Sequence, residues 1–168
     1  MPKIIENLRE KLIAEAQFQV SAYGYANLTI RSVAAACGVG VGTVYNYFTS
    51  KDMLVAAFML EDWRNCVAEA EQLSARSDAP QPVMQCIFQQ LQQFMTRYQT
   101  IFADESAVAH FSGSPSPYHS LLRGQLAQPL RKFCRDDFTS EFIAEALLTW
   151  TVAGRSFEEI YALLEKIL

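Results

Sequence analysis

The chain has 168 residues and a net charge of −4. Its length allows one domain or two small ones, and its apolar content of 51% excludes a disordered chain. No apolar run reaches the roughly 18 residues of a membrane span, and the N-terminus lacks the apolar segment of a signal peptide. The four cysteines are widely spaced without a Cys-x-x-Cys pair, so we expect reduced core residues of a cytoplasmic protein that has no membrane partner.

Charge is distributed unevenly along the chain. Residues 1–51 contain five basic and three acidic side chains, whereas residues 52–168 contain nine basic and fifteen acidic ones. A mildly basic head on an acidic body suits a regulator whose small N-terminal part contacts phosphate. It does not suit a protein that coats nucleic acid without sequence preference.

Helical spacing of apolar residues dominates the first half of the chain. Gly24 is expected to end the first helix, and Thr29 to cap a short second helix that ends at Gly38. Ser50 is the expected N-cap of a long fourth helix. The helices predicted here are residues 4–23, 29–37, 40–48 and 51–73.

The second half also lacks strand signals. Loop composition predicts connections at residues 74–82 and 112–117, and Pro129 should kink or split the helix in which it lies. The helices predicted here are residues 83–98, 101–111, 118–134, 139–153 and 155–167. We therefore expect an all-α protein of eight to ten helices.

The spacing of three small or apolar residues predicts a helix-turn-helix. Ala34 lets two helices cross closely, Gly38 supplies the positive φ of the turn, and Val44 fills the core beneath the second helix. Residues 43 and 45–47 then lie on or near the outer face, where a recognition helix meets the major groove. The alternative is that Tyr45, Tyr47 and Phe48 are core aromatics of a helical hairpin.

The stretch from Leu28 to Leu54 resembles the N-terminal domain of TetR-family transcriptional regulators. The resemblance covers roughly residues 8–55 and includes the run Gly-Thr-Val-Tyr-Asn-Tyr-Phe-Thr-Ser-Lys at 42–51. Gly40 stands where serine or threonine is common in the family, and glycine is also an acceptable N-cap. The resemblance implies a sequence-specific regulator of transcription, with a three-helix, helix-turn-helix DNA-binding domain at 1–50 and a helical effector-binding and dimerisation domain at 51–168.

The resemblance also implies roles for individual residues in binding a double-stranded operator. Thr29 would bond a phosphate, and Arg31 would contact a base edge, with guanine as its natural partner. Gly42 and Thr43 would open the recognition helix, and Tyr45 would touch a thymine methyl or the backbone. Tyr47 and Lys51 would hold phosphates, while Asn46 either reads adenine or is solvated.

Residues 52–168 contain no catalytic constellation. His110 and His119 have no cysteine or paired carboxylate at ligand spacing, so we expect no metal and no cofactor. The serines of the loop at 112–117 lack a nucleophile elbow. The sequence therefore does not support an enzyme.

Aromatic residues in this part of the chain suggest a cavity between helices. In the family this region binds a small effector, here a largely apolar one. The alternative for each residue is ordinary core packing. The expected ligand-binding residues, including two polar groups that would face the cavity, are Trp63, Phe94, Arg97, Tyr98 and His110.

The last two predicted helices are too apolar to cover only one face of a core. The resemblance implies that they pair with those of a second copy in a four-helix bundle, since a dimer reads a pseudo-palindrome. The alternative is that they close the monomer. The expected dimerisation residues are Phe142, Ala146, Trp150, Phe157, Tyr161 and Leu164.

These observations favour a dimeric, ligand-responsive transcriptional regulator, most often a repressor in this family. A protein–protein adaptor that keeps the fold without operator binding is the alternative. The complete set of DNA-contacting residue types in 29–51 argues against the adaptor.

Overall fold

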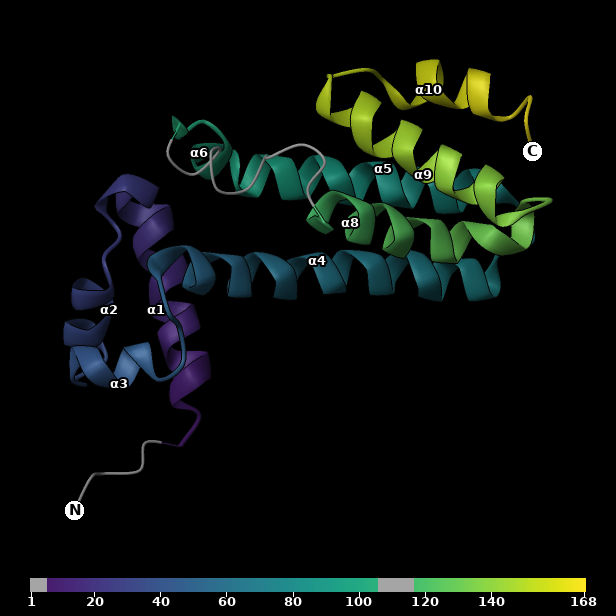
Figure 1. Ribbon diagram of the computed structural model, residues 1–168. Coiled ribbons are helices and arrows are strands. Elements are labelled where there is room, and N and C mark those ends of the chain that lie inside the picture. The colour runs from purple at the N-terminus through teal and green to yellow at the C-terminus, as the bar shows by residue number, and fades with distance from the viewer. Residues whose placement is uncertain (1–5, 106–116) are drawn as a thin grey trace. The chain divides into compact units, whose positions relative to one another are not determined.

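A computed structural model describes residues 6–105 and 117–168, with the side chains of 117–119 excepted. All regular structure in these residues is helical, as predicted (Figure 1). The described residues form two compact units: residues 6–62 with 99–105, here called the head, and residues 63–98 with 117–168, here called the body. The predicted division between residues 50 and 51 stays a prediction, because helix α4 starts at Lys51 and supplies residues to both units.

The head is built from short helices around α1. Figure 1 shows α2 and α3 beside α1. Gly24 and Gly38 have φ of 82° and 68°, so the two predicted turns use the left-handed region that favours glycine. The elements of the head are α1 (Leu8–Tyr23), the 3-10 turn η1 (Tyr25–Asn27), α2 (Ile30–Ala36), α3 (Val41–Tyr45), the start of α4 (Lys51–Arg76) and α6 (Gln99–Phe102).

The core of the head explains the Ala34, Gly38 and Val44 spacing. Ala34 and Val44 are 1% and 0% exposed, and Phe48 is also buried. Leu12 and Ala16 of α1 are fully buried in the same unit. These contacts support the predicted helix-turn-helix.

Helix α3 is shorter than predicted. It ends at Tyr45 rather than at Phe48, because Tyr47 N–H bonds the Val44 carbonyl at 2.9 Å in a tightened last turn. The amide of Phe48 bonds the same carbonyl at 3.0 Å. Residues 46 and 47 therefore form a hydrogen-bonded turn after the helix.

The body is a layered set of longer helices (Figure 1). Its largest contacts join α9 to α8 and to α5. The core includes Met84, Ile87, Leu130, Ile143 and Leu147, each at most 1% exposed. The elements are the C-terminal part of α4, α5 (Pro80–Arg97), α8 (Pro117–Ala127), the 3-10 helix η2 (Gln128–Phe133), α9 (Asp137–Val152) and α10 (Phe157–Leu164).

Prolines account for two boundaries in the body. Pro129 ends α8 and opens η2, which confirms the predicted break. The predicted loop at 74–82 was too long, because α4 continues to Arg76 and α5 begins at Pro80. Proline is tolerated in the first helical turn, where its missing N–H would have no partner in the helix.

Two further predictions are only partly covered. Helix α6 ends at Phe102, and residues 106–111 of the predicted helix at 101–111 lie outside the described residues. The four cysteines are free thiols and each is only partly buried; Cys86 and Cys134 pack against the core of the body, so the prediction of core cysteines holds only in part. No described helix is both long and apolar enough to cross a membrane.

Asp136 caps α9 and makes stability depend on pH. Its Oδ1 accepts a hydrogen bond from Thr139 N at 2.7 Å, and the Thr139 side chain and N–H lower the pKa of Asp136 below its ordinary value. The cap contribution is therefore present above the unfolded pKa of about 3.9 and is lost as pH falls through the lower, folded pKa. We expect the stability difference between the wild type and Asp136→Asn in urea unfolding to be constant near neutral pH and to shrink below about pH 4. A difference that did not change with pH would contradict this role.

Candidate nucleic-acid interface

An open groove on the head brings together residues from three helices. Its volume is about 580 Å³, and the N-terminal ends of α2 and α4 both border it. Four predicted DNA-binding residues are among those that line it: Thr29, Arg31, Tyr45 and Lys51. Both helix starts present backbone N–H groups, which favour an anion such as a phosphate.

The outer face of α3 and the turn that follows it carry the other predicted residues. Tyr45 and Tyr47 are 51% and 47% exposed, so their interpretation as core aromatics was wrong, whereas Phe48 does belong to the core. Gly42 and Asn46 are exposed, and Thr43 is partly buried. The exposed aromatic hydroxyls and amide can contact a ligand as large as DNA.

Thr29 is fixed at the start of α2 by a capping box. Its Oγ1 accepts a hydrogen bond from Ser32 N at 3.0 Å, which leaves the hydroxyl proton to donate to a phosphate oxygen. Ser32 in turn donates to Gln19 Oε1 of α1 at 2.6 Å, and Gln19 donates to Glu15 at 2.7 Å. Sequence reasoning missed Gln19, a buried amide that ties this helix start to α1.

The start of α4 is also fixed. Ser50 is its N-cap as predicted, since the hydroxyl accepts from Met53 N at 3.2 Å. The Lys51 ammonium lies beside Tyr25, whose hydroxyl donates to Asp52. Burial, followed by this hydrogen bond, raises the pKa of Tyr25 well above its ordinary value, so the phenol keeps its proton.

Arg9 is a second residue that sequence reasoning missed. Its guanidinium carbon lies 5.5 Å from the centroid of the Phe48 ring, directly after the recognition helix, and its side chain is exposed. Arg9 therefore adds a positive charge beside the Phe48 ring. A basic residue on α1 was visible in the sequence, but nothing there linked it to Phe48.

The predicted ligand-binding residues are only partly brought together. The rings of Trp63 and Phe94 are 5.5 Å apart, those of Phe94 and Tyr98 are 4.8 Å apart, and the Trp63 indole donates to Gln125 Oε1 at 2.8 Å. Arg97 is exposed, so its prediction as an inward-facing charge was wrong, whereas the next residue, Tyr98 at the C-cap of α5, is buried. His110 lies outside the described residues.

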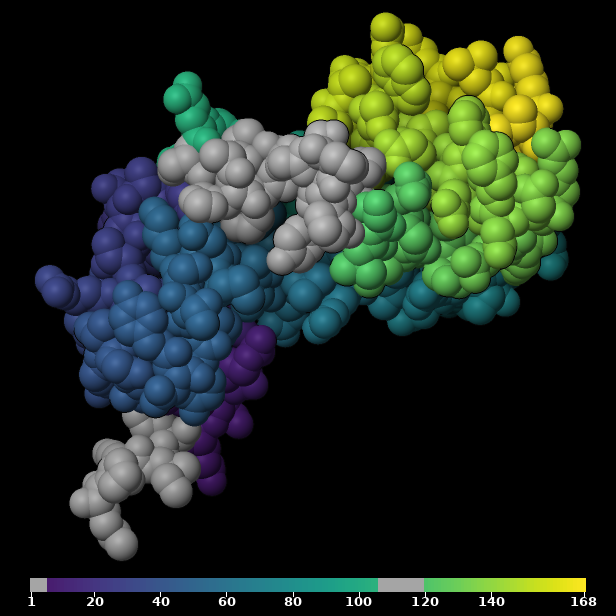
Figure 2. Space-filling model, viewed as in Figure 1, coloured from purple at the N-terminus to yellow at the C-terminus, as the bar shows by residue number. Residues whose placement is uncertain are grey.

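The predicted dimerisation residues divide into two groups. Phe157 and Leu164 are buried in the core of the body, so one chain already covers them. Phe142 and Trp150 are half exposed, and with Ala146 they form one side of a groove of about 340 Å³ whose other side is α10. Tyr161 is partly buried and stacks on Phe157 with ring centroids 5.5 Å apart. Figure 2 shows α9 and α10 adjacent at the surface of the body.

Comparisons with known proteins agree with this geometry. Residues 12–58 match the family of bacterial regulatory proteins described as the tetR family. The repressor AlkX from Dietzia sp. superposes with a TM-score of 0.67 at 15% identity, over 94% of this chain and 98% of that one. The repressor FadR from Thermus thermophilus, solved with lauroyl-CoA, superposes with a TM-score of 0.61 at 22% identity, over 94% and 90%. No curated protein matches the sequence. The structural likenesses show a shared fold, and the family match covers the residues that carry the groove.

Proposed function

We propose that this chain, a TetR-family transcriptional regulator by its N-terminal domain, is a ligand-responsive repressor that binds a pseudo-palindromic operator as a dimer. The observation that carries the proposal is the groove in which Thr29, Arg31, Tyr45 and Lys51 meet, beside the exposed face of α3. These residue types donate to phosphates and base edges.

The arrangement divides the contacts into two kinds. Thr29 and Lys51 stand at helix starts, where they bind phosphates and fix the register of the protein on DNA. Arg31, Tyr45 and Asn46 contact base edges in the major groove of the DNA. Tyr47 contacts a backbone phosphate. This division follows from placement, since Thr29 is the N-cap of α2 whereas Arg31 is the second residue of that helix and is exposed.

Arg31 and Lys51 are expected to differ in the specificity of their effects. Arg31→Ala should cost about 1–3 kcal/mol of operator binding and relax the preference at one base pair. Lys51→Ala should weaken binding to all DNA sequences alike. It should also reduce the slope of log affinity against log salt by the amount expected for about one phosphate contact. Binding titrations against operators with single substitutions, at several salt concentrations, check both. Unchanged affinity and preference in Arg31→Ala would remove its assignment.

The dimer is supported by the exposed apolar side chains of α9 and α10. Phe142, Ala146 and Trp150 are spaced four residues apart on α9, so they lie along one stripe. Leu163 of α10 is 67% exposed and borders the same groove. A second copy would cover this surface, and two heads related by a two-fold axis would read two half-sites.

An effector site in the body is supported by its aromatic cluster. The Phe94 ring contacts those of Trp63 and Tyr98, and the Trp63 indole donates to the Gln125 amide oxygen. A small, largely apolar molecule with one polar group would match these side chains if it displaced their mutual packing. The repressor FadR from Thermus thermophilus, which shares this fold, was solved in complex with lauroyl-CoA.

The decisive experiment selects genomic fragments with the purified protein and footprints those that are enriched, with Tyr47→Ala in parallel. Protection of a pseudo-palindrome by the wild type, lost in the variant, is the expected result. Release of that footprint by long-chain acyl compounds would support the effector site. A folded dimer that enriched nothing would instead favour the adaptor.

A further inference from the structure

Lys51 is held against Tyr25 of η1. Its ammonium nitrogen lies 4.1 Å from the centroid of the Tyr25 ring and donates a hydrogen bond to the Tyr25 carbonyl at 3.3 Å. The ring quadrupole attracts a cation placed over its face, and the attraction grows where water is excluded. Tyr25 is 2% exposed, so the head core holds the ring that receives the cation.

The position of Lys51 in its helix makes this support important. Lys51 is the first residue of α4, where the free N–H groups carry partial positive charge and repel an ammonium. The Tyr25 ring face and carbonyl oxygen supply the opposing negative potential. One N–H of the ammonium is used in this way, and two remain to donate to phosphate oxygens.

Tyr25 also contacts the neighbouring carboxylate. Its hydroxyl donates to Asp52 Oδ1. Asp52 is the one acidic residue among the described residues that line the groove, and a carboxylate there repels phosphate. The hydrogen bond directs one of its oxygens toward buried Tyr25.

We propose that Tyr25 is a positioning residue of the DNA interface, which holds the Lys51 ammonium ready for a backbone phosphate before DNA arrives. The inference rests on the DNA-binding function proposed above. A lysine already held in place loses less side-chain freedom on binding than one that samples solvent. Tyr25 itself is too buried to touch DNA, so it acts through Lys51.

The test is a double-mutant cycle of Tyr25→Leu and Lys51→Met on the footprinted operator. Tyr25→Leu is expected to weaken binding about three- to tenfold, the range of a cation–π contact. It should also lower the slope of log affinity against log salt by up to about 0.9, the value of one phosphate. In the Lys51→Met background it should add nothing, and Tyr25→Phe, which keeps the ring, should restore the slope.

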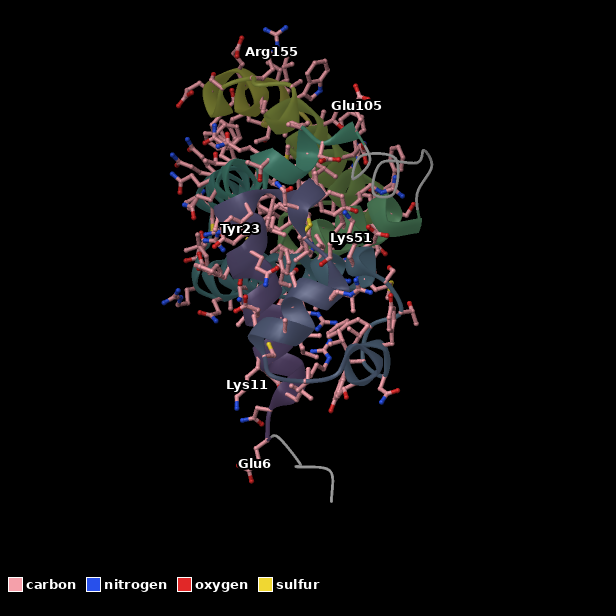
Figure 3. The ribbon with its side chains drawn as sticks, turned by 90° about the vertical axis from the view of Figure 1, so that its left-hand side faces the viewer. Glu6, Lys11, Tyr23, Lys51, Glu105 and Arg155 are labelled. Carbon is pink, nitrogen blue, oxygen red and sulfur yellow. The ribbon has the colours of Figure 1, made fainter. Side chains whose placement is uncertain are left out.

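Tyr23→Leu is the matched control, since Tyr23 is 62% exposed and its carbonyl, not its side chain, accepts the hydrogen bond from Asn27. Figure 3 labels Tyr23 and Lys51 at separate places on the head. The control should leave affinity and slope unchanged. If Tyr25→Leu lowered the unfolding midpoint, left the salt slope unchanged and weakened Lys51→Met further, Tyr25 would be a core residue only, and the proposal would be overturned.

A measurement without DNA separates this inference from the proposed function. The ring current of Tyr25 should shift the NMR signals of the terminal Lys51 methylene upfield in the free wild type, and the shift should disappear in Tyr25→Leu. Ordinary Lys51 shifts in a wild type that binds its operator would overturn only the role of Tyr25. A shifted Lys51 in a protein without any operator would mean that the proposed function had failed.

Discussion

Replacing Trp150 by glutamate is expected to give a folded monomer that binds its operator about a hundredfold or more weakly. Trp150 is 49% exposed within one chain and borders the groove between α9 and α10. A charge there is solvated in the monomer but would be desolvated in a dimer, where it would face its own copy across the two-fold axis. A monomer binds only one half-site, so it loses the gain in affinity from simultaneous binding of two, which is on the order of 10² or more.

Light scattering and operator titration of the same samples check this prediction. Leu121→Glu is the control, because Leu121 of α8 is equally exposed, at 50%, but does not line the groove. It should remain dimeric with unchanged affinity. A Trp150→Glu protein that stayed dimeric would place the interface elsewhere, and a monomeric wild type would remove the dimer from the proposed function.

Phe48→Ala and Tyr47→Ala, at adjacent positions, are expected to impair operator binding for different reasons. Phe48 is 5% exposed, so its truncation should cost about 3–5 kcal/mol of stability. Helix α3 has only five residues and cannot persist without its core contacts, so operator binding should be lost with them. Tyr47→Ala should change stability by less than about 0.5 kcal/mol and weaken operator binding alone.

Urea unfolding and operator titration distinguish the two outcomes, with hydrogen exchange of the Val44 and Phe48 amides to localise the loss to the head. Phe48→Leu, which keeps most of the volume, should recover much of the stability. If Tyr47→Ala were as destabilising as Phe48→Ala, the exposed face of α3 would not be the DNA-reading surface that we propose.

Local features of this protein were predictable because they depend on residues three or four positions apart. Thr29 and Ser50 cap their helices through the backbone N–H three residues on. Gly38 takes the positive φ that the helix-turn-helix spacing requires, and Pro129 breaks its helix. The family resemblance rests on the contiguous stretch from Leu28 to Leu54, which contains Thr29, Gly38 and Ser50.

Only the tertiary structure decided which apolar and charged groups meet. Helical periodicity shows that a residue lies on an apolar face but not which neighbour covers it, so Phe157 and Leu164 proved to be monomer core while Phe142 and Trp150 stayed exposed. For the same reason, helical periodicity did not show that Arg97 is exposed. Lys51 and Tyr25 are brought together by the fold of the head, across residues that no local pattern connects. The sequence by itself determined the helices, their caps and the DNA-reading motif, whereas the surfaces available to a second copy and the support of Lys51 depend on packing between distant segments.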